Sequence, residues 1–234
     1  GKTIFKSKIK WILALILLTG CIYGSYTLSR YTEADQVEAK QAQVILDAGH
    51  GGSDPGKIGL NNILEKDINL AIAKQLQKVL ERNDCQVIMT READQGLYEE
   101  SDTNKKRADM AKRVSIMNGC DADVVVSIHQ NSYQSPEVKG AQVFYYKHSA
   151  EGKKLAQILQ KSLKENLDTE NKRQEKEDST YYMLLHTGAP TVIAECGFLS
   201  NPQEAALLNT AEYRQKVAEA LCKGILEYFT STGK

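Results

Sequence analysis

The fold of this chain is decided by one stretch, Val44-Ile45-Leu46-Asp47-Ala48-Gly49-His50-Gly51-Gly52. Its first three residues are apolar and partly β-branched, which predicts a short buried strand. The glycines lack the Cβ atoms that would hinder a sharp turn or a close approach. His50 therefore follows the carboxyl end of a strand, the edge where open α/β sheets bind ligands. An ordinary turn is the alternative, whereas a phosphate-binding loop would need a hydroxyl where Ile58 follows Lys57.

Strands and helices alternate along the rest of the chain. Apolar runs predict strands at residues 44–46, 86–89, 124–128, 141–146 and 191–194. Helical spacing of apolar residues, or an N-terminal signal, predicts helices from residues 64, 105, 151 and 201 and a last helix through 217–229. Residues 168–179 are polar and predict a solvated loop. The alternation predicts an α/β fold, a single domain with a mainly parallel twisted sheet flanked by helices on both faces.

The first thirty residues differ in charge from the rest of the chain. They hold five of the 30 basic residues and no acid, so residues 31–234 carry 25 basic against 30 acidic side chains, a net charge of −5. This balance argues against a nucleic-acid binder, which would show a basic face. The five cysteines include no CxxC pair, which argues against a disulfide scaffold or a thiolate zinc site.

An uncharged stretch, residues 11–29, follows the basic N-terminus and predicts a hydrophobic helix. As a helix it would measure about 28 Å, close to the roughly 30 Å core of a bilayer. A cleaved signal peptide and a lipoprotein signal ending at Cys21 are the rival interpretations. All three place the following domain outside the cytoplasm. We therefore expect a signal anchor or signal peptide at 1–30, a linker at 31–42 and one catalytic domain at 43–231.

Four polar side chains are expected to meet at one edge of the sheet. His50, His129 and Glu195 each follow a predicted strand, and Glu65 opens the helix that returns from that edge. Two histidines and one glutamate form a known set of protein ligands for catalytic zinc. We expect His50, Glu65 and His129 to bind Zn²⁺ and Glu195 to act as the general base.

Alternatives remain for each of these residues. His129 could be a buried histidine bonded to the backbone, and Glu65 could interact with the dipole of its helix. Glu195 continues an apolar strand, where ionisable groups are rarely placed for packing. Asp47 is expected to orient a metal-bound histidine from behind, with a capping or turn role as its alternative.

Several motifs in order along the chain closely resemble the zinc-dependent N-acetylmuramoyl-L-alanine amidases of the amidase-3 family. They are DAGHGGSDPG at 47–56, EKD at 65–67, RVSIMN at 113–118, SIHQN at 127–131 and ECGFLSNP at 195–202. The resemblance covers residues 43–229 and is strongest to the spore-cortex subgroup that acts in germination. It implies zinc on His50, Glu65 and His129 with Glu195 catalytic, and it makes Arg113, Asn118 and Asn131, together with Arg91, candidates for substrate contact. Gln130 and Met117 depart from the family pattern, which often has alanine at both positions.

The resemblance implies hydrolysis of the amide between the lactyl group of N-acetylmuramic acid and L-alanine in peptidoglycan. It also implies action in the cell wall or spore cortex of a Gram-positive bacterium, with membrane attachment through the N-terminal segment. Because the three expected zinc ligands come from separate segments, an enzyme that stays inactive until a protein partner improves its zinc affinity is a further interpretation. A zinc peptidase acting on another peptidoglycan bond and a non-catalytic peptidoglycan-binding module are the alternatives.

Overall fold

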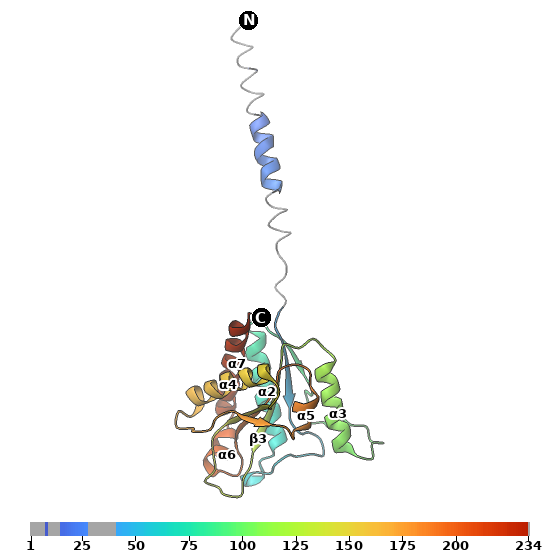
Figure 1. Cartoon of the computed structure of the whole chain (residues 1–234), viewed down its shortest axis with the longest axis vertical. Coiled ribbons are helices and arrows are strands. Elements are labelled where there is room, and N and C mark those ends of the chain that lie inside the picture. The colour runs from blue at the N-terminus through green and yellow to red at the C-terminus, as the bar shows by residue number, and fades with distance from the viewer. Residues whose placement is uncertain (1–7, 9–14, 28–40, 234) are drawn as a thin grey trace. The chain divides into compact units, whose positions relative to one another are not determined.

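The computed structural model describes residue 8, residues 15–27 and residues 41–233 (Figure 1). The chain divides into two units, Gly1–Lys40 and Gln41–Lys234. In the first unit residues 15–27 are helical, and large apolar side chains such as Leu17 and Tyr23 are exposed on this helix. Among the described residues, no helix has both the length and the apolar character needed to cross a bilayer. Residues 11–14 and 28–29 of the predicted membrane segment, and 31–40 of the predicted linker, lie outside the described residues.

The second unit is built on one six-stranded sheet with the strand order β2-β1-β3-β6-β4-β5. Its strands are β1 (Gln43–Ala48), β2 (Gln86–Met89), β3 (Val124–Asn131), β4 (Gln142–Tyr146), β5 (Lys176–Asp178) and β6 (Thr191–Phe198). The first four strands in that order are mutually parallel, whereas β4 pairs antiparallel with β6 and parallel with β5. The four parallel strands carry their carboxyl ends to one edge, as the sequence predicts.

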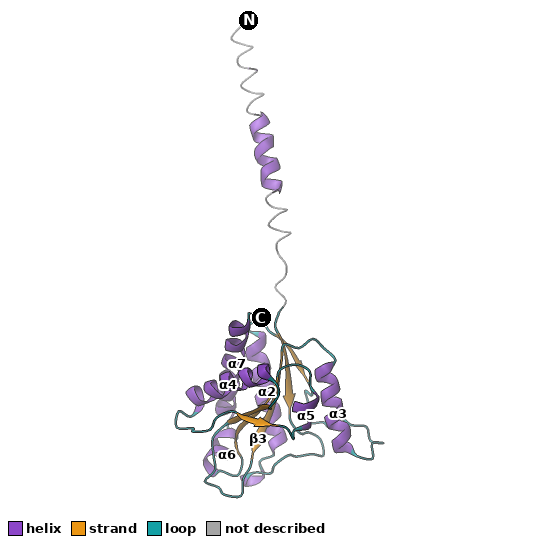
Figure 2. Cartoon of the chain, in the orientation of Figure 1, coloured by secondary structure: helices purple, strands orange, loops and turns teal. Residues whose placement is uncertain are grey.

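Helices cover both faces of this sheet (Figure 2). They are the 3₁₀ turn η1 (Leu60–Asn62), α2 (Glu65–Glu81), α3 (Lys105–Asn118), α4 (Ala150–Leu167), α5 (Tyr182–His186), α6 (Pro202–Leu208) and α7 (Ala211–Thr232). The main core lies between the sheet and α2, α4 and α7, where Val44 and Leu46 of β1 are fully buried. Ile45 and Val125 point to the opposite face and pack against Met117 of α3 and Met183 of α5.

The alternation of side chains along the strands decides which polar groups share the α3 and α5 face. Because successive residues of a strand point to opposite faces, Asp47 lies on the same face as Ile45. Ser127 and His129 follow Val125 on that face by the same rule. Neighbouring parallel strands keep this register, which pairs His129 of β3 with Glu195 of β6. The polar side chains of Asp47, Ser127 and His129 therefore lie on the face of the sheet that α3 and α5 cover.

The structure corrects two local predictions and adds one element. Strands β3 and β6 run on to Asn131 and Phe198, so His129 and Glu195 lie within strands rather than after them. The segment 168–179 is not only a loop, because β5 pairs its residues 176–178 with the edge of β4. The added element is the short helix α5, for which no prediction was made.

Candidate metal centre

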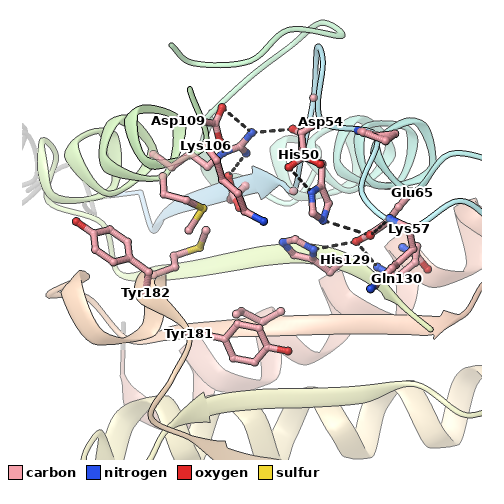
Figure 3. Close-up of a pocket in the computed structure, with 18 of the residues that line it drawn as sticks. His50, Asp54, Lys57, Glu65, Lys106, Asp109, His129, Gln130, Tyr181 and Tyr182 are labelled. Atoms are coloured by element: carbon pink, nitrogen blue, oxygen red, sulfur yellow. Dashed lines mark hydrogen bonds and ion pairs between the residues drawn. The ribbon is translucent and has the colours of Figure 1, made fainter. Parts of the chain in front are cut away.

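His50, Glu65 and His129 converge although they come from three separate elements (Figure 3). Nδ1 of His129 lies 2.9 Å from Oε1 of Glu65, and Nε2 of His50 lies 3.2 Å from Oε2 of the same carboxylate. Each of the three residues offers one ligand atom, and these atoms lie within 4.8 Å of one another. Two imidazole nitrogens and one carboxylate oxygen form a donor set that suits zinc.

Glycine residues make room for this convergence. A Cβ on Gly49 would collide with the ring of His129. A Cβ on Gly56 would lie 2.5 Å from Oε2 of Glu65, and Gly56 also has a φ of +67°. His50 itself adopts a φ of 62°, the left-handed region that non-glycine residues enter rarely. Gly49 and Gly56 are therefore required by the close packing of the metal-ligand candidates.

Glu65 is held in place by donors other than the histidines. Its Oε1 accepts hydrogen bonds from the backbone N of Gln130 at 3.1 Å and from Nδ2 of Asn69 at 3.3 Å, and its Oε2 accepts one from the backbone N of Lys57 at 2.8 Å. Burial alone would raise the pKa of Glu65, but hydrogen bonds from His129 and His50 outweigh it and hold that pKa far below its usual range. Glu65 is therefore a fixed carboxylate.

The electrostatics of His129 follow from the same carboxylate. Burial would lower the pKa of this histidine, whereas the hydrogen bond and the charge of Glu65 raise it to about 8. A divalent cation would take the place of a proton between these groups, because metal ligands must be deprotonated. The carboxylate of Glu65 and the imidazole nitrogens of His50 and His129 are thus suited to bind a cation between them.

Glu195 lies beside the metal-ligand candidates without belonging to their group. It pairs with His129 across β3 and β6, and the register of these strands shifts immediately afterwards, between His129 and Asn131. The side chain is only 7% exposed, and its Oε2 is buried with no hydrogen-bond partner in the described part of the chain. Burial raises the pKa of Glu195 to about 7, against the lowering effect of His129. Such a carboxyl group can exchange a proton near neutral pH.

These side chains line a cavity of about 720 Å³. Its wall also includes Lys57 from the loop after β1, Lys106 and Met110 from α3, and Tyr181 and Tyr182 at the start of α5. Burial, with the nearby charge of Glu195, raises the pKa of Tyr181 to about 12, so its hydroxyl stays protonated at neutral pH. The cavity therefore offers a candidate metal group, a proton-exchanging carboxyl and a phenol within one enclosure.

Residues 44–227 match the family model Amidase_3, described as N-acetylmuramoyl-L-alanine amidase. This chain belongs to that family. It is therefore an amidase that acts on peptidoglycan.

Relatives and solved structures show the same similarity. The germination-specific N-acetylmuramoyl-L-alanine amidase of Bacillus subtilis (strain 168) is 36% identical over 97% of this chain and 98% of its own length. The CwlD amidase of Clostridioides difficile, solved in complex with the GerS lipoprotein, superimposes with a TM-score of 0.80 at 38% identity, over 82% of this chain and all of that one. The amidase AmiC2 of Nostoc punctiforme gives a TM-score of 0.71 at 33% identity, over 81% of this chain and 97% of that one.

In the described part of this amidase, Asp47 forms no hydrogen bond with His50 or His129. Its Oδ1 accepts from Nη1 of Arg113 and from Oγ1 of Thr90, both at 2.7 Å, and its Oδ2 accepts from Oγ of Ser127 at 2.6 Å. The side chain is fully buried, which would raise its pKa, but Arg113 and the hydroxyl donors lower it to about 2. The expected support of a histidine comes instead from Asp54, whose Oδ2 accepts from Nδ1 of His50 at 2.9 Å. That bond leaves Nε2 of His50 facing Glu65.

The sequence contained a signal for Asp54. It stands four residues after His50 in the turn Ser53-Asp54-Pro55-Gly56, and its Oδ1 also accepts from the backbone N of Gly56. A carboxylate at that distance, in a turn that must fold back on the histidine, points to the histidine as its hydrogen-bond partner.

Two buried arginines hold the backbone that carries His50. Arg113 is 1% exposed, and its guanidinium donates to Asp47, Asp109, Ala48 O and His50 O. Arg91 donates to the carbonyl oxygens of Ala48, Gly49, Lys66 and Ala93. Arg113 borders the floor of the cavity, but its donors are directed to protein acceptors. The predicted substrate contact of Arg113 remains a prediction, and its contacts indicate a supporting role.

The two predicted asparagines lie in different places. Asn131 borders the cavity, and its Oδ1 accepts from the backbone N of Ser132. Asn118 does not border the cavity; its Nδ2 donates to His186 O at 2.8 Å, and its Oδ1 accepts from Gly188 N at 2.9 Å. Asn118 thus joins the end of α3 to the end of α5. The lining residues Lys106, Tyr181 and Tyr182 were missed, because no sequence pattern showed that α5 and α3 flank the same cavity.

Proposed function

We propose that this chain is a zinc-dependent amidase that hydrolyses the bond between the lactyl group of N-acetylmuramic acid and L-alanine, the first residue of the stem peptide. The family match supports the bond that is cut. The observation that carries the zinc dependence is the convergence of His50, Glu65 and His129 on the wall of a cavity, with Glu195 next to them.

Zinc in such a site acts as a Lewis acid toward a carbonyl group and lowers the pKa of water. His50, Glu65 and His129 would hold the ion. Glu65 is fixed by Lys57 N, Asn69 and Gln130 N, which keeps the group in position before an ion arrives. Because the carboxylate is already in position, less conformational entropy is lost when the ion binds.

Glu195 performs the proton transfers in this mechanism. Its buried Oε2 takes a proton from the water molecule that attacks the lactyl carbonyl carbon. The new C–O bond forms, the C–N bond to alanine breaks, and the same carboxyl group returns the proton to the alanine nitrogen. A general acid–base group of this kind contributes about 10²–10⁴-fold to the rate.

Three features support a role outside the cytoplasm in the spore cortex. The B. subtilis relative is named germination-specific, cell-wall amidases act beyond the cytoplasmic membrane, and residues 1–30 have the composition of an export or anchor segment. The C. difficile relative was solved with a lipoprotein. We propose that this amidase is exported or membrane-anchored and that a protein partner activates it.

Digestion of purified muropeptides by the zinc-loaded full chain tests the activity, with the products identified by mass spectrometry. We expect free muramic acid ends and intact stem peptides. His129→Ala should lose both zinc and activity, whereas Glu195→Gln should keep zinc and lower kcat by about 10²–10⁴-fold. His148→Ala replaces an exposed histidine outside the cavity and should change neither. Shortened stems, or undiminished cleavage by Glu195→Gln, would contradict the proposal.

A further inference from the structure

The two sides of the cavity differ in charge. Among the described lining residues, α3 and the loop after β1 supply three lysines, Lys57, Lys105 and Lys106, together with the carboxylates of Asp54 and Asp109. The start of α5 supplies only uncharged side chains, those of Tyr181, Tyr182 and Met183. We call these sides the α3 wall and the α5 wall. The candidate metal group lies between them (Figure 3), and Glu195 lines the same cavity.

Lys106 is a lysine of the α3 wall whose ammonium group has no salt bridge among the described residues. Its ammonium forms no ion pair or hydrogen bond with any residue that the structure describes, whereas the neighbouring Lys105 pairs with Glu100 at 2.8 Å. Two carboxylates lie nearby. The charge of Lys106 helps to lower the pKa of Asp54, but Asp54 accepts its hydrogen bonds from His50 and the backbone N of Gly56, and Asp109 accepts from Arg113. In Figure 3 the Lys106 side chain reaches toward the cavity. Its charge is therefore available to an anionic ligand.

The two tyrosines of the α5 wall are held by aromatic neighbours. Tyr181 packs edge-on against Phe144, with ring centroids 5.8 Å apart. Tyr182 stacks on His186, with centroids 4.1 Å apart and ring planes 23° apart. Both tyrosines remain partly exposed, at 37% and 42%, and both border the cavity. Rings fixed in this way present an apolar surface with a polar tip, which suits the C–H face and hydroxyls of a sugar.

We infer that the substrate lies across the metal group in one direction, with the carboxylates of the stem peptide toward Lys106 and the muramic acid ring against Tyr182 and Tyr181. The inference rests on the proposed function. The bond that is cut joins an anionic peptide to an uncharged sugar unit, and the cavity offers a cationic wall and an uncharged aromatic wall on either side of the reacting group. The reversed orientation would place peptide carboxylates on the α5 wall, which has no cation among its described lining residues.

Binding constants test this orientation without turnover. The full, zinc-loaded chain carrying Glu195→Gln serves as the background, so that the substrate is not consumed. Calorimetry would give Kd for three synthetic ligands: N-acetylmuramoyl tripeptide, the same compound with its peptide carboxylates amidated, and a lactoyl tripeptide that lacks the sugar.

Lys106→Gln tests the α3 wall. We expect it to raise Kd about threefold to fivefold for the muramoyl tripeptide and to leave Kd for the amidated compound unchanged, since an exposed charge contributes modestly. The matched control is Lys112→Gln, which removes the same charge from the exposed side of the same helix, outside the cavity. It should affect the two ligands equally.

Tyr182→Ala tests the α5 wall. We expect Kd for the muramoyl tripeptide to rise about fivefold and Kd for the lactoyl tripeptide to stay unchanged, because only the first compound has a ring to lose contact. Tyr182→Phe should keep most of the affinity. Tyr133→Ala, an exposed tyrosine outside the cavity, is the control.

The outcomes separate the inference from the function on which it rests. Equal effects of Lys106→Gln on the free and amidated ligands, or of Tyr182→Ala on the ligands with and without sugar, would overturn the orientation. Failure of the unmodified chain to cleave any muropeptide would overturn the proposed function, whatever the binding constants show.

Discussion

Asp47 and Arg113 form a buried ion pair directly behind the loop that carries His50. Nη1 of Arg113 lies 2.7 Å from Oδ1 of Asp47, and both side chains are almost completely buried. The same guanidinium donates to the carbonyl oxygen of His50 at 2.7 Å. A buried pair of this kind does little for net stability, but removal of one partner leaves an uncompensated charge. Its effect here is to fix the position of a candidate ligand through the main chain.

The pair predicts a specific pH dependence of stability. The pKa of Asp47 is about 2 in the folded protein and about 4 in an unfolded chain. Because the folded-state pKa is the lower one, the stabilisation is complete above about pH 4 and is lost as the pH falls from 4 toward 2. We expect Asp47→Asn to lower the free energy of unfolding at pH 7 by about 2–4 kcal/mol, and by much less near pH 2.

Urea unfolding at several pH values measures this difference. Asp84→Asn is the control, because Asp84 is exposed and has a φ of 59°, which asparagine tolerates well. A loss of stability for Asp47→Asn that stays constant from pH 7 to pH 2 would show that the carboxylate charge is not responsible.

At the scale of elements, α5 is a short helix of the site that depends on contacts with neighbouring elements. It has only five residues, and its end is attached to α3 by Asn118 and by Thr187, whose Oγ1 lies 3.5 Å from Sδ of Met117. The helix nevertheless begins with two of the tyrosines that line the cavity. The aromatic wall is therefore held both by the packing of Met183 and Leu184 against the sheet and by these contacts at the far end of α5.

Asn118→Ala should loosen α5 without unfolding the domain. We expect faster amide hydrogen exchange in residues 182–188 and a loss of about 1 kcal/mol of global stability, the usual value of a lost hydrogen bond. Asn83→Ala removes a comparable exposed side-chain bond at the end of α2 and should leave exchange in α5 unchanged. If Asn118 instead binds substrate, its replacement would weaken substrate binding while exchange in α5 stays the same.

The periodicity of the chain predicted most elements, and its failures have physical causes. Helix α3 begins and ends where the pattern predicts, because Asn104 caps it and Gly119 ends it. Strand β5 was missed because Lys176 and Glu177 are exposed, charged residues of an edge strand, so that no apolar residue marks it in the sequence. Strands β3 and β6 continue through polar residues because the neighbouring backbone pairs with them there.

The convergence of His50, Glu65 and His129 was predictable for a related reason. Parallel strands bring their carboxyl ends to one edge, so residues distant in sequence meet there whatever the details of packing. Asp54 and the cavity wall were not predictable in this way. The end of α5 is held by contacts with Asn118 and Met117. Such tertiary contacts produce no periodic pattern in the sequence.

At the scale of the whole molecule, the candidate metal group links the two sides of the sheet. Glu65 starts α2 on the larger core, whereas His129 points to the face of α3 and α5. An ion bound between them would connect these layers only in the folded state. Binding would therefore stabilise the entire domain rather than one loop.

Zinc should raise the unfolding temperature of the metal-free full chain. At a free concentration one hundred times Kd, the gain is about 2.7 kcal/mol, or roughly 5–10 °C for a domain of this size. Differential scanning calorimetry would measure the shift, and removal of zinc by a chelator should reverse it. His129→Ala should abolish the response and His148→Ala should retain it. A full shift in His129→Ala would place the ion elsewhere.

The order of the reacting groups along the chain has a consequence for when hydrolysis can begin. His50 is in the first strand–loop unit, and Glu195 is in β6, the last strand of the sheet to be synthesised. A nascent polypeptide that ends before β6 contains His50 and His129 but lacks Glu195 and the strand that pairs with His129. Competence to cut peptidoglycan thus arrives late in biosynthesis, after nearly the whole domain has been synthesised and has folded.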